Sequence, residues 1–247
     1  MITSKMKVLG IDTSSAVGSI GIIEDESVIA EYSLNVVESH SARLMLAIDD
    51  VLKRAGLKIQ EIDAFAVTTG PGSFTGLRIG MSTVKGFCYA LKKPIVGVVT
   101  LDVLAYNLKY ADKLICPILD ARKQEVYSAI YRGGLKLVRQ TDYLCAKIES
   151  ILAQLTEPTI FVGDGVNRYR EVIIQNLKEL AIIAEPPFGF CRGAVVALLG
   201  YERLANGESD DYFSITPFYI RKSEAEVRME GNQTFRKRKK SSIIRNN

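Results

Sequence analysis

The feature that most constrains the fold of this 247-residue chain is a pattern that occurs twice. Residues 7–12 form a short apolar segment that ends on Asp12, and residues 114–120 repeat this arrangement with Asp120 at the end. Each carboxylate is followed by a predicted strand pair and then by alternating helices and strands. Because such a repeat duplicates a whole supersecondary unit, the sequence predicts two α/β lobes of mixed sheet flanked by helices, with a cleft between them.

The predicted elements give the two lobes their boundaries. In the first we expect strands at 7–12, 19–24, 27–34, 62–69 and 94–99, a helix that stops at Gly56, and helices at 75–90 and 101–108. In the second we expect strands at 114–119, 125–132, 135–144, 159–162 and 181–184 and helices at 145–155, 167–177 and 191–204. The N-terminal lobe is thus predicted over 1–108 and the C-terminal lobe over 109–230, with the last helix packing back on the first lobe.

A glycine-rich segment, Gly70-Pro-Gly-Ser-Phe-Thr-Gly-Leu-Arg-Ile-Gly80, joins a predicted strand to a predicted helix. It lacks the Gly-Lys-Ser/Thr ending of a P-loop, and its spacing differs from that of a dinucleotide-binding fingerprint. Two interpretations remain open. The segment is either a tight strand-to-helix turn or a place where the backbone closely approaches another group, because glycine has no side chain to prevent it.

Composition excludes several classes of function. His40 is the only histidine, which excludes zinc sites with two imidazoles and disfavours a hydrolase built on a nucleophile and paired bases. No Cys-x-x-Cys pair occurs among Cys88, Cys116, Cys145 and Cys191, so we expect reduced thiols in a cytoplasmic protein. No apolar run approaches the ~18 residues of a membrane span.

The residues after the first predicted strand have the character of a phosphate-binding turn. Asp12 is followed by Thr13, Ser14 and Ser15, whose hydroxyl and amide groups could hold phosphates while the carboxylate holds Mg²⁺. Together with the duplication, this turn suggests the actin/sugar-kinase/Hsp70-like (ASKHA) fold, in which Asp120 would be the second carboxylate.

Four motifs resemble those of the TsaB (YeaZ) family, in the same order over about residues 6–227. They are Ile11-Asp-Thr-Ser-Ser15, the glycine-rich segment at 70–80, Asp120-Ala-Arg with the downstream Glu125-Val-Tyr127, and Tyr219-Ile-Arg-Lys-Ser-Glu-Ala-Glu226. The resemblance implies a bacterial subunit that is not itself catalytic but binds the related catalytic subunit TsaD, with the ATPase TsaE joining them. Together these proteins transfer a threonylcarbamoyl group to the tRNA adenosine next to the anticodon.

The resemblance also bears on catalysis and cofactors. TsaD carries two metal-binding histidines, and the single histidine here cannot supply that pair. We therefore expect no catalytic residues, no bound metal and no cofactor of its own. The alternative is an active ATPase or phosphotransferase that binds ATP or ADP with Mg²⁺.

The second half of the nucleotide site departs from the pattern of the fold. Asp120 is followed by Ala121 and Arg122 instead of small glycines, and Asp164 interrupts the Gly163-Asp-Gly165 segment. A retained turn with a vestigial pocket is the interpretation that these departures favour, and a working ATP cleft is the alternative.

The helix at 75–90 suggests a protein interface. Its apolar residues lie on more than one side, and its glycines follow one another at intervals of four, which permits close helix packing. The family pairs through this region, so we predict a partner interface made of Met45, Leu46, Gly72, Gly76, Leu77, Gly80, Met81 and Val84. Arg78 and Lys85 are expected to face the partner or solvent. The alternative is a helix buried within its own lobe, and a homodimer of the isolated chain also stays open.

The net charge of +4 originates in the C-terminal tail. Its basic residues are Arg236, Lys237, Arg238, Lys239, Lys240 and Arg245. Removing these six from the 32 basic residues leaves 26 against 28 acidic ones. We expect residues 231–247 to be disordered, as a solubilising extension or as a contact with the phosphates of tRNA held by the complex.

Overall fold

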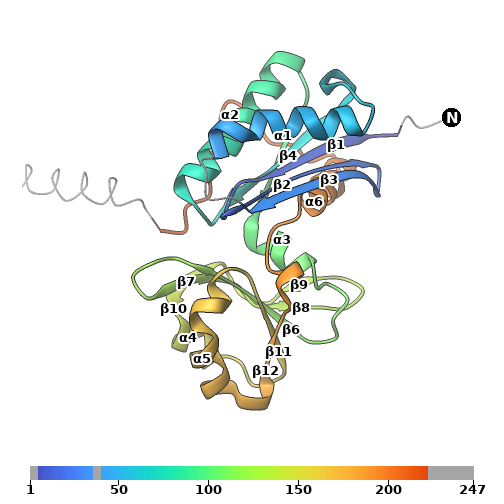
Figure 1. Ribbon diagram of the computed structural model, residues 1–247. Helices are drawn as coiled ribbons and strands as arrows, with labels where there is room; N and C mark the ends of the chain where they lie inside the picture. The colour runs from blue at the N-terminus through green and yellow to red at the C-terminus, as the bar shows by residue number, and fades with distance from the viewer. Residues whose placement is uncertain (1–4, 36–39, 222–247) are drawn as a thin grey trace, which may run out of the picture.

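The computed structural model describes residues 5–35 and 40–221, without the side chains of residues 40–42. The described chain forms two lobes, one above the other in Figure 1, with α3 (Thr100–Tyr106) between them. Among the described residues, no helix combines the length and the apolar character needed to cross a membrane. The predicted basic tail lies outside the described residues.

The N-terminal lobe is built on a five-stranded sheet in the order β3-β2-β1-β4-β5. The strands are β1 (Lys7–Asp12), β2 (Val17–Glu24), β3 (Ser27–Asn35), β4 (Ala64–Gly70) and β5 (Ile95–Val99). The first three are antiparallel neighbours, whereas β4 and β5 run parallel to β1. Every residue of β4 is buried, as expected of a strand that helices cover on both faces.

Helices cover the two faces of this sheet (Figure 1). α1 (His40–Arg54) and α2 (Phe74–Leu91) share an apolar core with one face, and α6 (Gly193–Ala205) packs on the other. Side chains of the sheet hold the start of α6: Ser19 Oγ accepts from the Gly193 amide at 2.8 Å, and Glu31 accepts from the Ala194 amide at 3.0 Å. Because the first amides of a helix have no partner within it, these acceptors anchor α6 on the N-terminal lobe.

The C-terminal lobe repeats this order with its own strands. Its sheet follows the path β10-β7-β6-β11-β12, which matches β3-β2-β1-β4-β5 position by position, and the central strand again ends on an aspartate. The elements are β6 (Leu114–Asp120), β7 (Glu125–Ser128), β8 (Tyr131–Arg132), β9 (Val138–Arg139), β10 (Leu144–Lys147), α4 (Ile148–Leu152), β11 (Thr159–Val162), α5 (Gly165–Leu177) and β12 (Ala181–Ile183). Short 3₁₀ turns lie at η1 (Ile59–Glu61) in the N-terminal lobe and at η2 (Lys178–Leu180) and η3 (Pro186–Phe188) after α5. The predicted duplicated α/β fold is confirmed.

The structure corrects the prediction for residues 135–155. The strand predicted over 135–144 is reduced to β9, and the strand that pairs with β7 is β10, where a helix was predicted to begin at Cys145. Only α4 remains of that helix. Four residues are too few for apolar spacing to distinguish a strand from a helical turn, so pairing with β7 decides the outcome.

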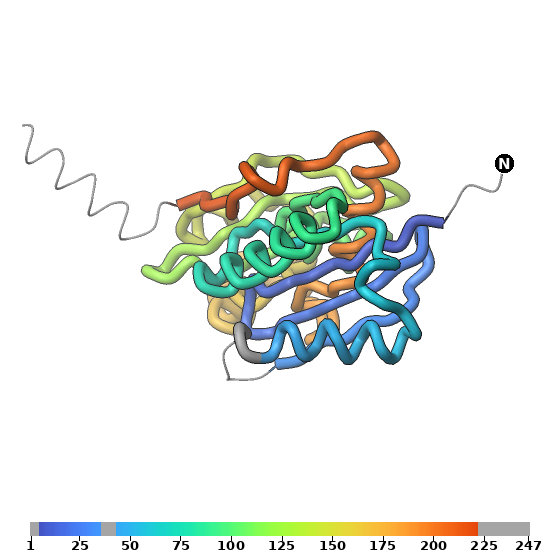
Figure 2. The backbone as a smooth tube through the Cα atoms, turned by 90° about the horizontal axis from the view of Figure 1, so that it is seen from above, coloured from blue at the N-terminus to red at the C-terminus, as the bar shows by residue number. Residues whose placement is uncertain are grey.

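After α6 the chain returns along the N-terminal lobe and reaches the C-terminal lobe. Figure 2 shows this orange-red segment, residues 206–221, passing beside α2. Two hydrogen bonds fix its course: Lys85 Nζ donates to the Ile215 carbonyl at 2.9 Å, and the Phe218 amide donates to the Thr69 carbonyl at 2.8 Å. The end of the described chain is thus held against the ends of the central strands.

Candidate functional site

The turn after β1 is buried rather than open. Asp12 is 0% exposed and Thr13 is 1% exposed. Asp12 Oδ1 accepts a hydrogen bond from Thr68 Oγ1 at 2.7 Å and another from the Ser14 amide at 3.1 Å. Since a buried carboxylate is costly unless such donors surround it, these bonds make Asp12 part of the framework that joins β1 to β4.

The N-terminal end of α2 lies directly on this turn. The Ser73 amide donates to the Ser14 carbonyl at 2.7 Å, and Thr13 Oγ1 donates to the Gly76 carbonyl at 2.7 Å. A Cβ atom at Gly76 would lie 2.0 Å from the Thr13 carbonyl oxygen, and one at Gly80 would lie 2.4 Å from Thr13 Oγ1. The glycine row therefore seats α2 on the turn of its own lobe. Both interpretations of the segment hold, because it is a tight turn between β4 and α2 and its backbone also lies directly against the turn after β1.

This packing corrects the prediction for five of the eight residues assigned to the partner interface. Gly76, Leu77, Gly80, Met81 and Val84 are buried inside the N-terminal lobe, and Leu77, Met81 and Val84 are at most 3% exposed. They belong to the core because they face the sheet and the turn. A partner could not contact them without opening that core.

Other residues of these two helices face outward. Met45 and Leu46 of α1 were predicted for the interface, and they are 51% and 69% exposed. Gly72 is half-buried against the Ser14 backbone. Phe74 and Tyr89 of α2 are 40% and 58% exposed, and their rings pack on aromatic side chains of the segment after α6.

The second strand end is built from charged groups. Asp120 Oδ2 lies 2.9 Å from Arg168 Nη1 and 3.7 Å from Arg122 Nη1, and its Oδ1 accepts from the Arg122 amide at 2.9 Å. The Asp120 side chain is 19% exposed. Sequence reasoning missed Arg168 because α5 is 48 residues further along the chain. The two guanidinium groups neutralise the negative charge of the Asp120 carboxylate, which disfavours binding of a divalent cation there.

The nucleotide site of the fold class does not fit these residues as they lie. Phosphates and Mg²⁺ need a carboxylate and hydrogen-bond donors that face a common opening. Here the Thr13 hydroxyl is bonded to α2, Asp12 is bonded to Thr68, and Asp120 is paired with arginines. Among the described residues, no group of three histidine, cysteine, aspartate or glutamate side chains could hold a metal ion.

Cys191 lies near the first strand end, but its thiol is not set up for nucleophilic chemistry. Its side chain is 2% exposed and its sulfur lies 3.6 Å from the Thr100 carbonyl oxygen. Burial raises the pKa of the Cys191 thiol well above its usual value, and the Asp12 carboxylate adds to this increase, while the Ser14 hydroxyl opposes it. Because the thiolate is the reactive form, Cys191 is a structural residue.

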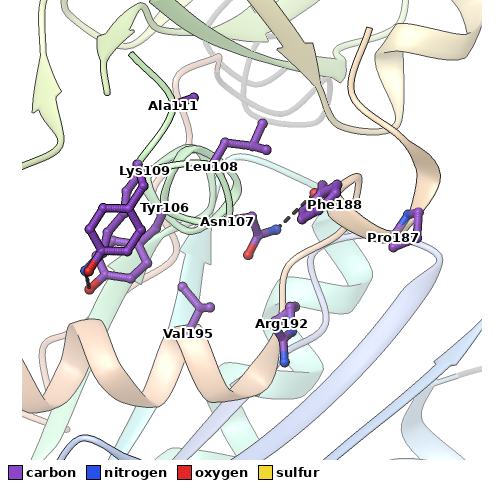
Figure 3. A pocket seen from close by; sticks show the side chains of 10 residues that line it. Tyr106, Asn107, Leu108, Lys109, Ala111, Pro187, Phe188, Arg192 and Val195 are labelled. Atoms are coloured by element: carbon purple, nitrogen blue, oxygen red, sulfur yellow. Dashed lines mark hydrogen bonds between the residues drawn. The ribbon is translucent and has the colours of Figure 1, made fainter. Parts of the chain in front are cut away.

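A separate cavity of about 600 Å³ lies where the end of α3 meets α6 (Figure 3). Its walls come from residues 106–111, from Pro187 and Phe188 of η3, and from Arg192 and Val195 of α6. Asn107 Nδ2 donates to the Phe188 carbonyl at 3.0 Å across it. None of the residues predicted for the nucleotide site lines this cavity.

The duplicated lobes and the carboxylate at each central strand end place this protein in the ASKHA class of two-lobed α/β proteins. In agreement with that class, component A of (R)-2-hydroxyglutaryl-CoA dehydratase from Acidaminococcus fermentans superposes with a TM-score of 0.51 at 12% identity over 81% of this chain and 99% of that one.

Closer relatives define the family. A family model described as TsaD, tRNA N6-adenosine threonylcarbamoyltransferase, matches residues 28–229. The tRNA threonylcarbamoyladenosine biosynthesis protein TsaB of Bacillus subtilis is 32% identical over 227 residues, 90% of this chain and 97% of that protein. A crystal structure from Pseudomonas aeruginosa, described as similar to peptidase YEAZ, has a TM-score of 0.74 at 26% identity and covers 87% of this chain and 100% of its own. The chain belongs to the TsaB (YeaZ) family.

Proposed function

We propose that this protein acts in tRNA threonylcarbamoyladenosine biosynthesis as a non-catalytic subunit. It binds and supports a TsaD-type catalytic subunit, with a TsaE-type ATPase, in the transfer of the threonylcarbamoyl group to the tRNA adenosine next to the anticodon. Its membership in the TsaB family supports the pathway. The observation that carries the non-catalytic role is the engagement of both strand-end carboxylates, Asp12 beneath α2 and Asp120 between two arginines.

The outward face of α1 is the surface we assign to the catalytic partner. Met45 and Leu46 are adjacent in sequence and more than half exposed, which is unusual for two large apolar side chains of a helix. A partner helix that covers them would remove apolar area from water at about 25 cal/mol per Å². This assignment replaces the glycine row, which the chain uses internally.

Complex formation is the direct test of this function. Mixed with a TsaD-type subunit, the protein should form a complex whose mass by light scattering equals the sum of the two chains. Leu46→Asp should weaken that complex at least about tenfold, which corresponds to roughly 1.4 kcal/mol. Leu135→Asp is the matched control, because Leu135 is 95% exposed in the C-terminal lobe and should not affect binding.

Catalysis is tested with the isolated protein. It should neither modify tRNA nor hydrolyse ATP at a rate above a protein-free blank, and both activities should require the partner subunits. Mg²⁺-dependent ATP turnover by the isolated chain that is lost on Asp120→Asn would contradict the proposal and favour an active ATPase of the same fold.

A further inference from the structure

The segment that follows α6 is fastened to the N-terminal lobe at several points. Asp210 Oδ2 accepts from the Gly97 amide at 2.7 Å and from Arg203 Nη1 at 3.1 Å. Further on, Lys85 Nζ donates to the carbonyls of Phe213 and Ile215, at 3.3 Å and 2.9 Å. These bonds place residues 210–215 along β5 and α2.

The next residues lie at the end of β4, beside the first carboxylate. The Phe218 amide donates to the Thr69 carbonyl, and Thr69 follows the residue whose hydroxyl binds Asp12. The ring of Tyr219 stacks on Phe74 with centroids 5.2 Å apart, and its hydroxyl accepts from Arg78 Nε at 3.2 Å. Arg78 and Lys85, which the sequence assigned to a partner or to solvent, therefore hold this segment.

Two residues later the same segment reaches the second lobe. Arg221 Nη1 lies 2.6 Å from Glu125 Oε2, and Arg221 Nη2 donates to the Ala121 carbonyl at 2.6 Å. Ala121 directly follows Asp120. Residues 218–221 thus connect the neighbourhood of one strand-end carboxylate to that of the other.

A second contact continues into the helix between the lobes. The ring of Phe218 meets the ring of Tyr143 edge-on at 5.6 Å. Tyr143 donates its hydroxyl proton to the Asp102 carboxylate of α3, at 2.7 Å to Oδ2, and Tyr131 of β8 donates to Oδ1 of the same carboxylate at 2.6 Å. The segment is therefore coupled to α3 as well as to the C-terminal sheet.

We propose that residues 216–221 form a strap that holds the two lobes together across the strand ends, and that the lobes separate at these ends when Arg221 leaves Glu125. The contacts of the strap are asymmetric, and this asymmetry indicates that the strap is released from the C-terminal lobe and stays on the N-terminal lobe. The strap and the preceding residues have hydrogen bonds to β4, β5 and α2 on the N-terminal lobe, whereas the Arg221 side chain makes the polar contacts of the described strap with the C-terminal lobe. A charge-assisted Arg–carboxylate pair is strong enough to hold a closed state, and it can be broken without unfolding either lobe.

The proposal concerns the chain by itself and does not depend on any partner, so the full-length protein alone tests it. Arg221→Met should speed amide hydrogen exchange about tenfold in the turns at residues 70–73 and 120–124, because the strap contacts residues at both: Thr69 and Phe74 beside the first, and Ala121 in the second. Arg132→Met is the matched control. Arg132 pairs with Glu157 inside the C-terminal lobe, and its side chain is 38% exposed against 32% for Arg221.

Two further variants keep the test decisive. Glu125→Gln preserves the shape of the acceptor and removes its charge. It should therefore increase amide exchange at the same two turns less than Arg221→Met does. If Arg221→Met does not fold, Glu125→Gln takes its place in the test. Exchanging the charges, with Glu125→Arg and Arg221→Glu together, should restore part of the protection. If folded Arg221→Met or Glu125→Gln protein shows the same exchange as Arg132→Met at both turns, the strap does not hold the lobes.

Discussion

The two lobes share one topology but use the same strand end in different ways. In the N-terminal lobe Asp12 is fully buried and bonded to neutral donors of its own lobe, beneath the start of α2. In the C-terminal lobe Asp120 is partly exposed and paired with arginines. Both lobes have the same strand order because that order determines how the sheet packs against the helices in each apolar core. A side chain at a strand end can differ between the lobes without disturbing this packing.

The largest expected effect comes from the contact between α2 and the first turn. Gly76→Val should lower the free energy of unfolding by about 3 kcal/mol or more, because its Cβ would lie 2.0 Å from a backbone oxygen that cannot move away. Gly86→Ala is the control in the same helix, since nothing lies within 4 Å of a Cβ there. It should raise stability by up to about 1 kcal/mol. Denaturant unfolding measures the stability of both variants. If both change the free energy of unfolding by the same amount, α2 does not pack closely on the turn after β1.

The next effect concerns the hydrogen bond to the buried carboxylate. Thr68→Val should cost about 2 kcal/mol, because it keeps the shape and removes one donor from Asp12. The adjacent Thr69 donates to the Val98 carbonyl at 3.2 Å, and Thr69→Val should cost only about 1 kcal/mol because its acceptor is uncharged. If Thr69→Val lowers the free energy of unfolding as much as Thr68→Val, the buried Asp12 carboxylate does not depend more on its donor than a neutral carbonyl does, which would contradict the comparison of the two strand ends.

One buried thiol in each lobe allows the stability of the two lobes to be compared at alkaline pH. Burial raises the pKa of Cys88 in the N-terminal lobe and of Cys116 in the C-terminal lobe from 9.0 to about 12. The raised pKa contributes stability that is fully present below pH 9 and is lost as the pH rises toward about 12, since only the unfolded chain loses the proton. At pH 10 each buried thiol should lower the free energy of unfolding by about 1.4 kcal/mol relative to its value at neutral pH.

Alanine substitutions separate the contributions of the lobes to this loss. If the lobes unfold together, Cys88→Ala and Cys116→Ala should each reduce the alkaline loss of the single unfolding transition by the same amount. Two transitions, each sensitive to one of the substitutions, would show that the lobes unfold independently and would weaken the case for a strap between them.

The smallest effect is expected at the second carboxylate. Asp120→Asn should change the free energy of unfolding by no more than about 0.5 kcal/mol, because the pair with Arg168, 49% exposed, is largely screened by solvent. Added salt should remove even this difference. A loss that equals that of Thr68→Val would mean that the two strand ends are energetically alike.

Much of the fold follows from local patterns in the sequence. The strands that end on Asp12 and Asp120 could be placed because uninterrupted apolar runs precede both residues. Residues 135–155 could not be placed, since β10 is a strand only through its pairing with β7. The α2 part of the predicted partner interface lies in the core for a related reason. Glycine spacing predicts that something lies close to a helix, but it does not say whether that neighbour belongs to another chain.

The sequence by itself determined the duplicated two-lobed class and the family, because both depend on the order of apolar segments and on motifs that lie within a few residues. Only the tertiary structure decided what those motifs contact. Thr13 meets Gly76 across 63 residues, and Arg221 meets Glu125 across 96. No local pattern records such pairs, because the two partners come together only when the sheets and helices have packed.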